Sequence, residues 1–367
     1  MRFFQGEFID TASPTSLEWL RFQISTSVVC VLRQLQRTRT SALVLSFCLM
    51  TLPAFSQTYK IIQRYKVPGS AVHSLAIDSE HRRLFVADSV GLLVLNADTG
   101  ERIGTVGNLR DMDDVLLLPA TQLGSATAAY QGYATDQHGS VIAFSPADLT
   151  TAKTMHLTAP GPASLCYDSD ANTVEAVSSE GALASIDAAT GQILSSGKVP
   201  TGSGQIACGN LDRVYVADPA TNVVHVLNHS KLMNEGDYPM QAGRQPSGVA
   251  LDTKGRRLFV TCENGVIEIV DTDAGFIFIE LKGGTGTGRS TFVWLPQGKG
   301  QWKAAAFSAQ QDGTLAGVRM NAFINYTLGS TSRLASGLEA VAWDEKTHHL
   351  YMTAMDAGSP VVLVAGY

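Results

Sequence analysis

One stretch of the sequence, Gln245–Lys282, most restricts the fold that this chain can adopt. It contains four short apolar runs, each separated from the next by a turn rich in glycine, aspartate or asparagine: Ser247–Leu251, Arg257–Thr261, Val266–Asp271 and Phe276–Leu281. Apolar runs of four to eight residues between such turns are typical of β-strands joined by hairpins. A single four-stranded sheet cannot bury both of its apolar faces, so this stretch requires neighbouring sheets to cover it.

The same pattern recurs along the chain, which supplies those neighbours. Seven copies can be traced: His73–Val106, Asp114–Leu157, Ala163–Ser196, Gly204–Asn228, Gln245–Lys282, Thr291–Leu328 and Leu338–Tyr367. The second copy is divergent and has an enlarged first turn. Successive copies begin roughly 40 to 50 residues apart, which is the repeat length of four-stranded propeller blades.

The last copy ends after its third strand, and one additional strand, Thr58–Val67, precedes the first copy. We therefore predict an all-β, seven-bladed β-propeller whose last blade is closed by the N-terminal strand of the mature chain, with Ile61–Lys66 alongside Val361–Val364. A β-sandwich or two separate β-domains would explain neither seven similar units nor a terminal unit that lacks a strand. Since no Pro/Gly/Ser-rich linker divides residues 57–367, we expect one propeller domain there.

The residues before the propeller resemble a leader with a secretory signal peptide at about residues 33–56. Three arginines between positions 33 and 39 precede the apolar run Ala42–Phe55, and the small residues Ala54 and Ser56 suit cleavage after Ser56. We expect residues 1–56 to be removed and the protein to be exported, either to the periplasm or out of the cell. The apolar run is too short to predict a membrane span. The 32 residues before position 33 favour a mis-assigned translation start, with an unusual leader as the alternative.

The charge of the chain argues against nucleic acid as a partner. The full sequence has 27 basic and 33 acidic residues, and removal of residues 1–56 leaves 22 and 30, a net charge of −8. Non-specific binding to nucleic acid depends on neutralising phosphates with Lys and Arg, so an acidic chain is poorly suited to it. We predict an acidic monomer that is not embedded in a membrane.

Three cysteines remain after the predicted cleavage, namely Cys166, Cys208 and Cys262. Three cysteines cannot all pair with one another, and none has the CxxC spacing of a metal or redox site. Each falls within a predicted strand, where a free cysteine behaves as a small hydrophobic residue. We therefore expect free, buried cysteines.

Several repeats resemble the YVTN-type, YncE-like β-propeller family. The resemblance is carried by LFVAD at Leu84–Asp88, VYVAD at Val214–Asp218, PSGVALD at Pro246–Asp252 and RLFVTCENGVIEIVDTDAG at Arg257–Gly275. It extends over Thr58–Tyr367, and it implies an exported bacterial propeller. The biochemical roles of this family are mostly undefined, with DNA binding proposed for some members. These motifs specify strand packing and turns, so they bear on fold more than on activity.

The predicted inner strands place one residue per blade at the mouth of the central channel. These are His73, Asp114, Ala163, Gly204, Ser247, Thr291 and Glu339. The three ionisable ones, Glu339, His73 and Asp114, fall in blades seven, one and two, which become neighbours when the ring closes. Such a group could bind a metal or perform acid–base catalysis, and the alternative is a solvated rim.

Further charged residues occupy nearby loops between the predicted blades. Asp111 and Asp113 add negative charge beside Asp114, and the arginines are Arg110, Arg244 and Arg289. Arginines around a pocket could hold a carboxylate or phosphate ligand, and the alternative is that they serve surface solubility.

The sequence favours a binding or scaffold module whose channel-mouth face takes a small molecule or a protein partner. We expect no catalysis and no cofactor. The alternative is a propeller lactonase-like hydrolase that uses Glu339, His73 and Asp114. A quinoprotein is disfavoured because the repeats lack a tryptophan after the Thr-Gly turn, and no GxSxG nucleophile motif in a strand-to-helix setting is present.

Overall fold

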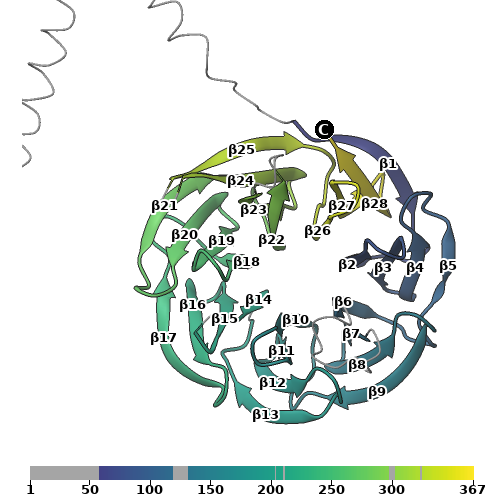
Figure 1. Ribbon diagram of the computed structural model, residues 1–367, viewed down its shortest axis with the longest axis horizontal. Coiled ribbons are helices and arrows are strands. Elements are labelled where there is room, and N and C mark those ends of the chain that lie inside the picture. The colour runs from purple at the N-terminus through teal and green to yellow at the C-terminus, as the bar shows by residue number, and fades with distance from the viewer. Residues whose placement is uncertain (1–57, 119–130, 203, 210, 297–301, 323–324) are drawn as a thin grey trace, which may run out of the picture. The chain divides into compact units, whose positions relative to one another are not determined.

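The computed structural model describes residues 58–118, 131–202, 204–209, 211–296, 302–322 and 325–367. The predicted leader and the enlarged turn of the second repeat lie outside these residues. Within them, the strands form seven four-stranded antiparallel sheets arranged as blades around a central channel (Figure 1). The all-β, seven-bladed propeller predicted from the repeats is confirmed.

The blades follow one another in chain order. Blade one contains β2 (Val72–Asp78), β3 (Arg83–Asp88), β4 (Gly91–Asn96) and β5 (Arg102–Thr105). Blade two contains β6 (Met112–Leu118), β7 (Gln131–Asp136), β8 (Ser140–Ser145) and β9 (Thr150–His156). Blade three contains β10 (Ala163–Asp168), β11 (Thr173–Ser178), β12 (Ala182–Asp187) and β13 (Ile193–Lys198). Blade four contains β14 (Ile206–Cys208), β15 (Arg213–Asp218), β16 (Val223–Asn228) and β17 (Met233–Pro239).

The remaining blades complete the ring. Blade five contains β18 (Pro246–Asp252), β19 (Arg257–Cys262), β20 (Val266–Asp271) and β21 (Ile277–Lys282). Blade six contains β22 (Ser290–Pro296), β23 (Trp302–Ala309), β24 (Thr314–Ala322) and β25 (Asn325–Arg333). Blade seven contains β26 (Val341–Asp344), β27 (His349–Asp356), β28 (Ser359–Gly366) and β1 (Lys60–Lys66). The first strand of each repeat lies innermost (Figure 1).

The core of the protein lies between the blades. Among the described residues there are seven clusters of buried apolar side chains, one at each interface between neighbouring blades. The middle strands are covered on both faces, so β19 is buried along its whole length, whereas the outermost strand β17 is almost entirely exposed. The apolar runs seen in the sequence are therefore the strands that two neighbouring blades cover.

The ring is closed by β1, the outermost strand of blade seven. It pairs antiparallel with β28 from Lys60 opposite Gly366 to Lys66 opposite Val361, which is the pairing expected from the sequence. Tyr59 is only 1% exposed, and its ring centroid lies 5.5 Å from that of Phe307 in blade six. Both ends of the described chain thus contribute to one blade.

A disulfide joins the inner strands of blades three and four. Cys166 in β10 is bonded to Cys208 in β14, with 5.8 Å between the Cα atoms, so the expectation of free cysteines is wrong for these two. Their separation of 42 residues is about one repeat, which brings the cysteines together where two inner strands converge on the channel. Cys262 is free and buried, as expected.

Within the described part of the chain, no helix has the length and apolar character needed to cross a membrane.

Ring closure by β1 can be tested with one substitution and a control from the same segment. We expect Tyr59→Ala to lower the free energy of unfolding by about 3–5 kcal/mol, because it removes a fully buried aromatic ring from the blade six–blade seven interface. Ile62 in β1 is 49% exposed, so Ile62→Ala should change the same quantity by less than about 0.5 kcal/mol. Urea denaturation of both variants measures the difference, and equal effects would contradict a closing role for this segment.

Candidate functional site at the channel mouth

The three ionisable residues predicted at the channel mouth lie in blades seven, one and two, but they form two separate contacts. His73 in β2 and Glu339, just before β26, approach each other with 3.2 Å between His73 Nδ1 and Glu339 Oε1. Their side chains are 24% and 41% exposed, so this pair remains accessible to solvent. The hydrogen bond with Glu339 raises the pKa of His73 above its ordinary value, and burial opposes this. His73 and Glu339 are therefore the accessible members of the predicted trio.

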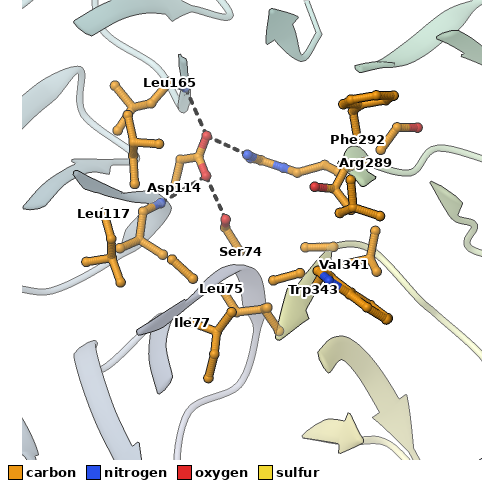
Figure 2. A pocket seen from close by; sticks show the side chains of 18 of the residues that line it. Ser74, Leu75, Ile77, Asp114, Leu117, Leu165, Arg289, Phe292, Val341 and Trp343 are labelled. Atoms are coloured by element: carbon orange, nitrogen blue, oxygen red, sulfur yellow. Dashed lines mark hydrogen bonds and ion pairs between the residues drawn. The ribbon is translucent and has the colours of Figure 1, made fainter. Parts of the chain in front are cut away.

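Asp114 in β6 is buried and surrounded by donors (Figure 2). Its Oδ1 accepts hydrogen bonds from Ser74 Oγ at 2.6 Å and from the Val115 amide at 2.9 Å. Its Oδ2 accepts the Leu165 amide at 2.9 Å and lies 2.6 Å from Arg289 Nη1. A carboxylate offers about four lone-pair sites, so Asp114 has none left for a substrate or a metal.

Arg289 precedes β22 in blade six and reaches Asp114 in blade two (Figure 2). These blades are not neighbours in the ring, so the ion pair crosses the channel. The Arg289 backbone is fixed because its amide donates to the Glu339 carbonyl at 2.8 Å. Burial alone would lower the pKa of Arg289, but the charges of Asp114 and Asp113 hold it above the ordinary value. Arg289 thus serves as a permanent cation that ties blades two and six together.

Asp113 lies beside this ion pair with weaker partners. Its Oδ2 is 3.5 Å from Arg289 Nη2, and its Oδ1 accepts a hydrogen bond from Gln137 Nε2 at 3.4 Å. Only 7% of the residue is exposed. Burial raises the pKa of Asp113 to about 6, against the lowering effect of Arg289. Because Arg289 is shared between Asp113 and Asp114, it compensates the negative charge of Asp113 only in part.

The other predicted residues do not join this cluster. Asp111 is exposed, and its Oδ2 lies 3.9 Å from His138 Nε2. Arg244 is exposed, and its guanidinium donates to the carbonyl oxygens of Gln241 and Gly243, at 2.8 Å and 2.6 Å. Arg110 is exposed as well. Of the three arginines, only Arg289 contributes to the channel mouth.

Two residues of the site, Ser74 and Gln205, are absent from the predicted set. Ser74 donates to Asp114. Gln205 Oε1 accepts hydrogen bonds from the amides of Val249 and Ser290, at 3.1 Å and 2.9 Å, which links blades four, five and six. Ser74 directly follows His73, and Gln205 directly follows Gly204; His73 and Gly204 are two of the seven residues predicted at the channel mouth. The position after each predicted mouth residue could therefore have indicated Ser74 and Gln205.

A cavity of about 380 Å³, which we call the mouth cavity, opens above this network. Blades two to seven contribute residues to it, and these include the small residues Ser179, Gly204 and Ser247 together with Glu263 and Glu339. Its volume lies within the range of ligand pockets. The mouth cavity is therefore a recess assembled from many loops.

The arrangement gives limited support for catalysis. Among the described residues, no group of three or more His, Cys, Asp or Glu side chains is placed to hold a metal ion. The His73–Glu339 pair could accept or donate a proton, but Asp114 is saturated and cannot act with it. The site therefore combines an accessible proton-binding pair with a rigid, internally neutralised ion pair.

Comparisons with known proteins support the fold alone. No protein-family model and no curated protein match the sequence. A solved structure described as "Crystal Structure of Mitotic Checkpoint Complex" contains a similar chain, with a TM-score of 0.65 and 13% sequence identity. The similarity covers 84% of this chain and 92% of that chain. At this identity the match shows a shared β-propeller fold and says nothing about a common ligand.

The ion pair across the channel should contribute strongly to stability. We expect Asp114→Ala to lower the free energy of unfolding by about 3–5 kcal/mol, because it leaves the largely buried Arg289 charge without its main partner. Adding Arg289→Met should recover part of that loss, since neither charge then remains. The exposed pair Arg64–Asp356, with side chains 48% and 49% exposed, provides the control: Arg64→Ala should cost less than about 1 kcal/mol. Similar losses for both single variants in urea denaturation would refute the structural role of Asp114.

The raised pKa of Asp113 predicts a pH-dependent stability difference. Because the folded-state pKa of about 6 exceeds the unfolded value, ionised Asp113 destabilises the protein above pH 6, and this cost disappears as the pH falls towards 4. We expect Asp113→Asn to be more stable than the wild type at pH 8, by about 2 kcal/mol, and to lose this advantage at pH 4. Thermal or urea unfolding across this range measures it. Asp111→Asn, at a side chain 54% exposed, is the control, and a pH-independent difference for Asp113→Asn would rule out the assignment.

Proposed function

We propose that this protein is an exported, non-catalytic binding module of the YVTN-type, YncE-like kind, whose mouth cavity receives a segment of a protein partner. The observation that carries the proposal is the saturation of Asp114 by Arg289, Ser74 and two backbone amides. The residue best placed to complete a catalytic group with His73 and Glu339 is thereby committed to holding the ring together. What remains is a rigid platform with an open recess.

The form of the mouth cavity supports a protein partner over a tightly enclosed small molecule. Its lining comes from six blades and consists largely of loops. Propellers commonly use such loops to recognise partners, and function depends on the site rather than on the fold. The similar chain noted above belongs to a structure described as a mitotic checkpoint complex, which is consistent with this use of the fold.

Export is supported by the disulfide between Cys166 and Cys208. Disulfides form and persist in oxidising compartments and are rare in the cytosol of most organisms. Together with the signal-like sequence at residues 33–56, this supports a partner outside the cytoplasm. The same compartment, with the net charge of −8 after cleavage, argues against nucleic acid as the partner.

Site-specific photo-crosslinking in cells that produce the full chain tests this proposal. A photoreactive phenylalanine at Ser179, which lines the mouth cavity, should form a discrete adduct with one partner in the extracytoplasmic fraction. The same residue at Ala189, in the exposed turn between β12 and β13, is the matched control because this turn lies at the opposite end of the same blade. Adducts of equal yield at both positions, or none at Ser179, would refute a partner at the mouth.

Activity measurements on the purified chain distinguish the lactonase alternative from the non-catalytic binding module. We expect no turnover across a panel of lactones, with or without added divalent metal ions. If the alternative is correct, turnover appears and is lost in Glu339→Gln, which removes the charged partner of His73. Arg64→Ala, at a side chain 48% exposed in the outermost strand β1, serves as the control for non-specific loss of activity.

A further inference from the structure

Away from the channel mouth, one buried carboxylate of blade three faces a histidine of blade four. Glu175 in β11 is 0% exposed. Its Oε1 accepts a hydrogen bond from Ser185 Oγ at 2.8 Å and lies 2.8 Å from Nε2 of His229, which directly follows β16. Its Oε2 has no hydrogen-bond partner among the described residues. An ionised carboxylate is costly to bury without a compensating cation, so the position of Glu175 favours a positive charge on His229.

His229 has a carboxylate near each of its two ring nitrogens. Nε2 faces Glu175 and also lies 2.7 Å from Thr173 Oγ1, while Nδ1 lies 3.3 Å from Oδ1 of Asp212 in blade four. A neutral imidazole has one N–H donor, and its other nitrogen is an acceptor. In the neutral ring, one nitrogen lone pair would therefore point at a carboxylate. Only the protonated ring, with an N–H on both nitrogens, suits Glu175 and Asp212 at once.

The charges around His229 act in the same direction. Asp168, the last residue of β10 in blade three, adds a third negative charge. The hydrogen bond with Glu175 raises the pKa of His229 above its ordinary value of 6.5, burial opposes this, and the charges of the three carboxylates raise the pKa further. Lys231, in the same turn as His229, is exposed to solvent. His229 therefore holds its proton more tightly in the folded protein than in the unfolded chain.

The turn that carries His229 also packs against blade three. It comprises residues 229–232, which connect β16 to β17. Leu232 is 3% exposed and belongs to the apolar cluster between blades three and four. It lies against Gly197 in β13, where an added Cβ would be 2.9 Å from the Leu232 Cβ. The turn thus contacts blade three through one ionisable side chain and one apolar side chain.

From these observations we propose that His229 is a proton-dependent latch between blades three and four. The protonated ring holds the turn of residues 229–232 against Glu175. Loss of the proton at alkaline pH leaves the buried charge of Glu175 uncompensated, so the turn is released. The inner strands of the same blades remain joined by the disulfide between Cys166 and Cys208, so the blades stay linked at the channel. The latch is separate from the mouth cavity and does not depend on the partner proposed there.

Hydrogen–deuterium exchange of the purified protein, read by mass spectrometry, tests the latch. Because the folded-state pKa of His229 is raised, its stabilising effect is fully present below the unfolded value of 6.5 and is lost as the pH rises through the folded-state pKa. After correction for the intrinsic pH dependence of exchange, peptides covering residues 229–233 should exchange at least about threefold faster at pH 9 than at pH 6. Equal protection at the two pH values would overturn the proposal.

Two variants separate a proton switch from a contact that is merely structural. His229→Gln keeps a side-chain donor but cannot become charged, so the turn should already exchange at pH 6 as the wild type does at pH 9. Glu175→Gln removes the buried negative charge, so a neutral His229 no longer leaves it uncompensated and the turn should stay protected at both pH values. Loss of protection in both variants at every pH would show an ordinary packing contact and refute the latch.

Two further variants keep the test decisive if His229→Gln does not fold. Asp212 has a side chain 52% exposed, and Asp212→Asn weakens the attraction for the proton, so it should shift the midpoint of the opening to lower pH. His81 in blade one has a side chain 59% exposed, and His81→Gln should leave the pH response of residues 229–233 within about twofold. A response that is unchanged in Asp212→Asn, or that persists in His229→Gln, would assign it to another group and overturn the proposal.

Discussion

Each blade of this protein has two apolar faces, and only a neighbouring blade can cover them. This constraint makes the pairing of β1 with β28 decisive, because without it blade seven would lack its outer strand and the contribution of Tyr59 to the interface with blade six. Ring closure removes the unpaired sides that an open array of sheets would present. The central channel, which the inner strands of all seven blades surround, is enclosed only in the closed ring.

Inside the ring, the Arg289–Asp114 ion pair has a different task from the accessible pair of His73 and Glu339. The first is largely buried and links blades that are not neighbours, so it fixes the spacing of the channel walls. The second remains open to solvent at the mouth. This division of roles leaves a rigid link inside the channel and an accessible ionisable pair at its mouth.

Much of the fold could be predicted because the repeat is local and periodic, as in Gln245–Lys282, and because the last repeat lacks a strand that Thr58–Val67 supplies. The proximity of His73 and Glu339 followed from the same alignment. The contact of Asp114 with Arg289 did not, since it joins blades two and six across the ring and no periodic pattern encodes it. The disulfide was not predicted, because the position of Cys166 and Cys208 within strands gives no sign of pairing. Their separation of 42 residues, which is about one repeat, does place them at equivalent positions of neighbouring blades.

The disulfide lies in the interface between blades three and four, on the other side of the ring from the strands that close it (Figure 1). Closure pairs residues as distant in sequence as Lys60 and Gly366. Contacts over such distances form late in folding because a long loop must first be ordered. The covalent link instead joins adjacent repeats, so it can form before the ring is complete and hold two blades as a nucleus. Assembly can then proceed outward from the linked blades to the last, non-covalent seam.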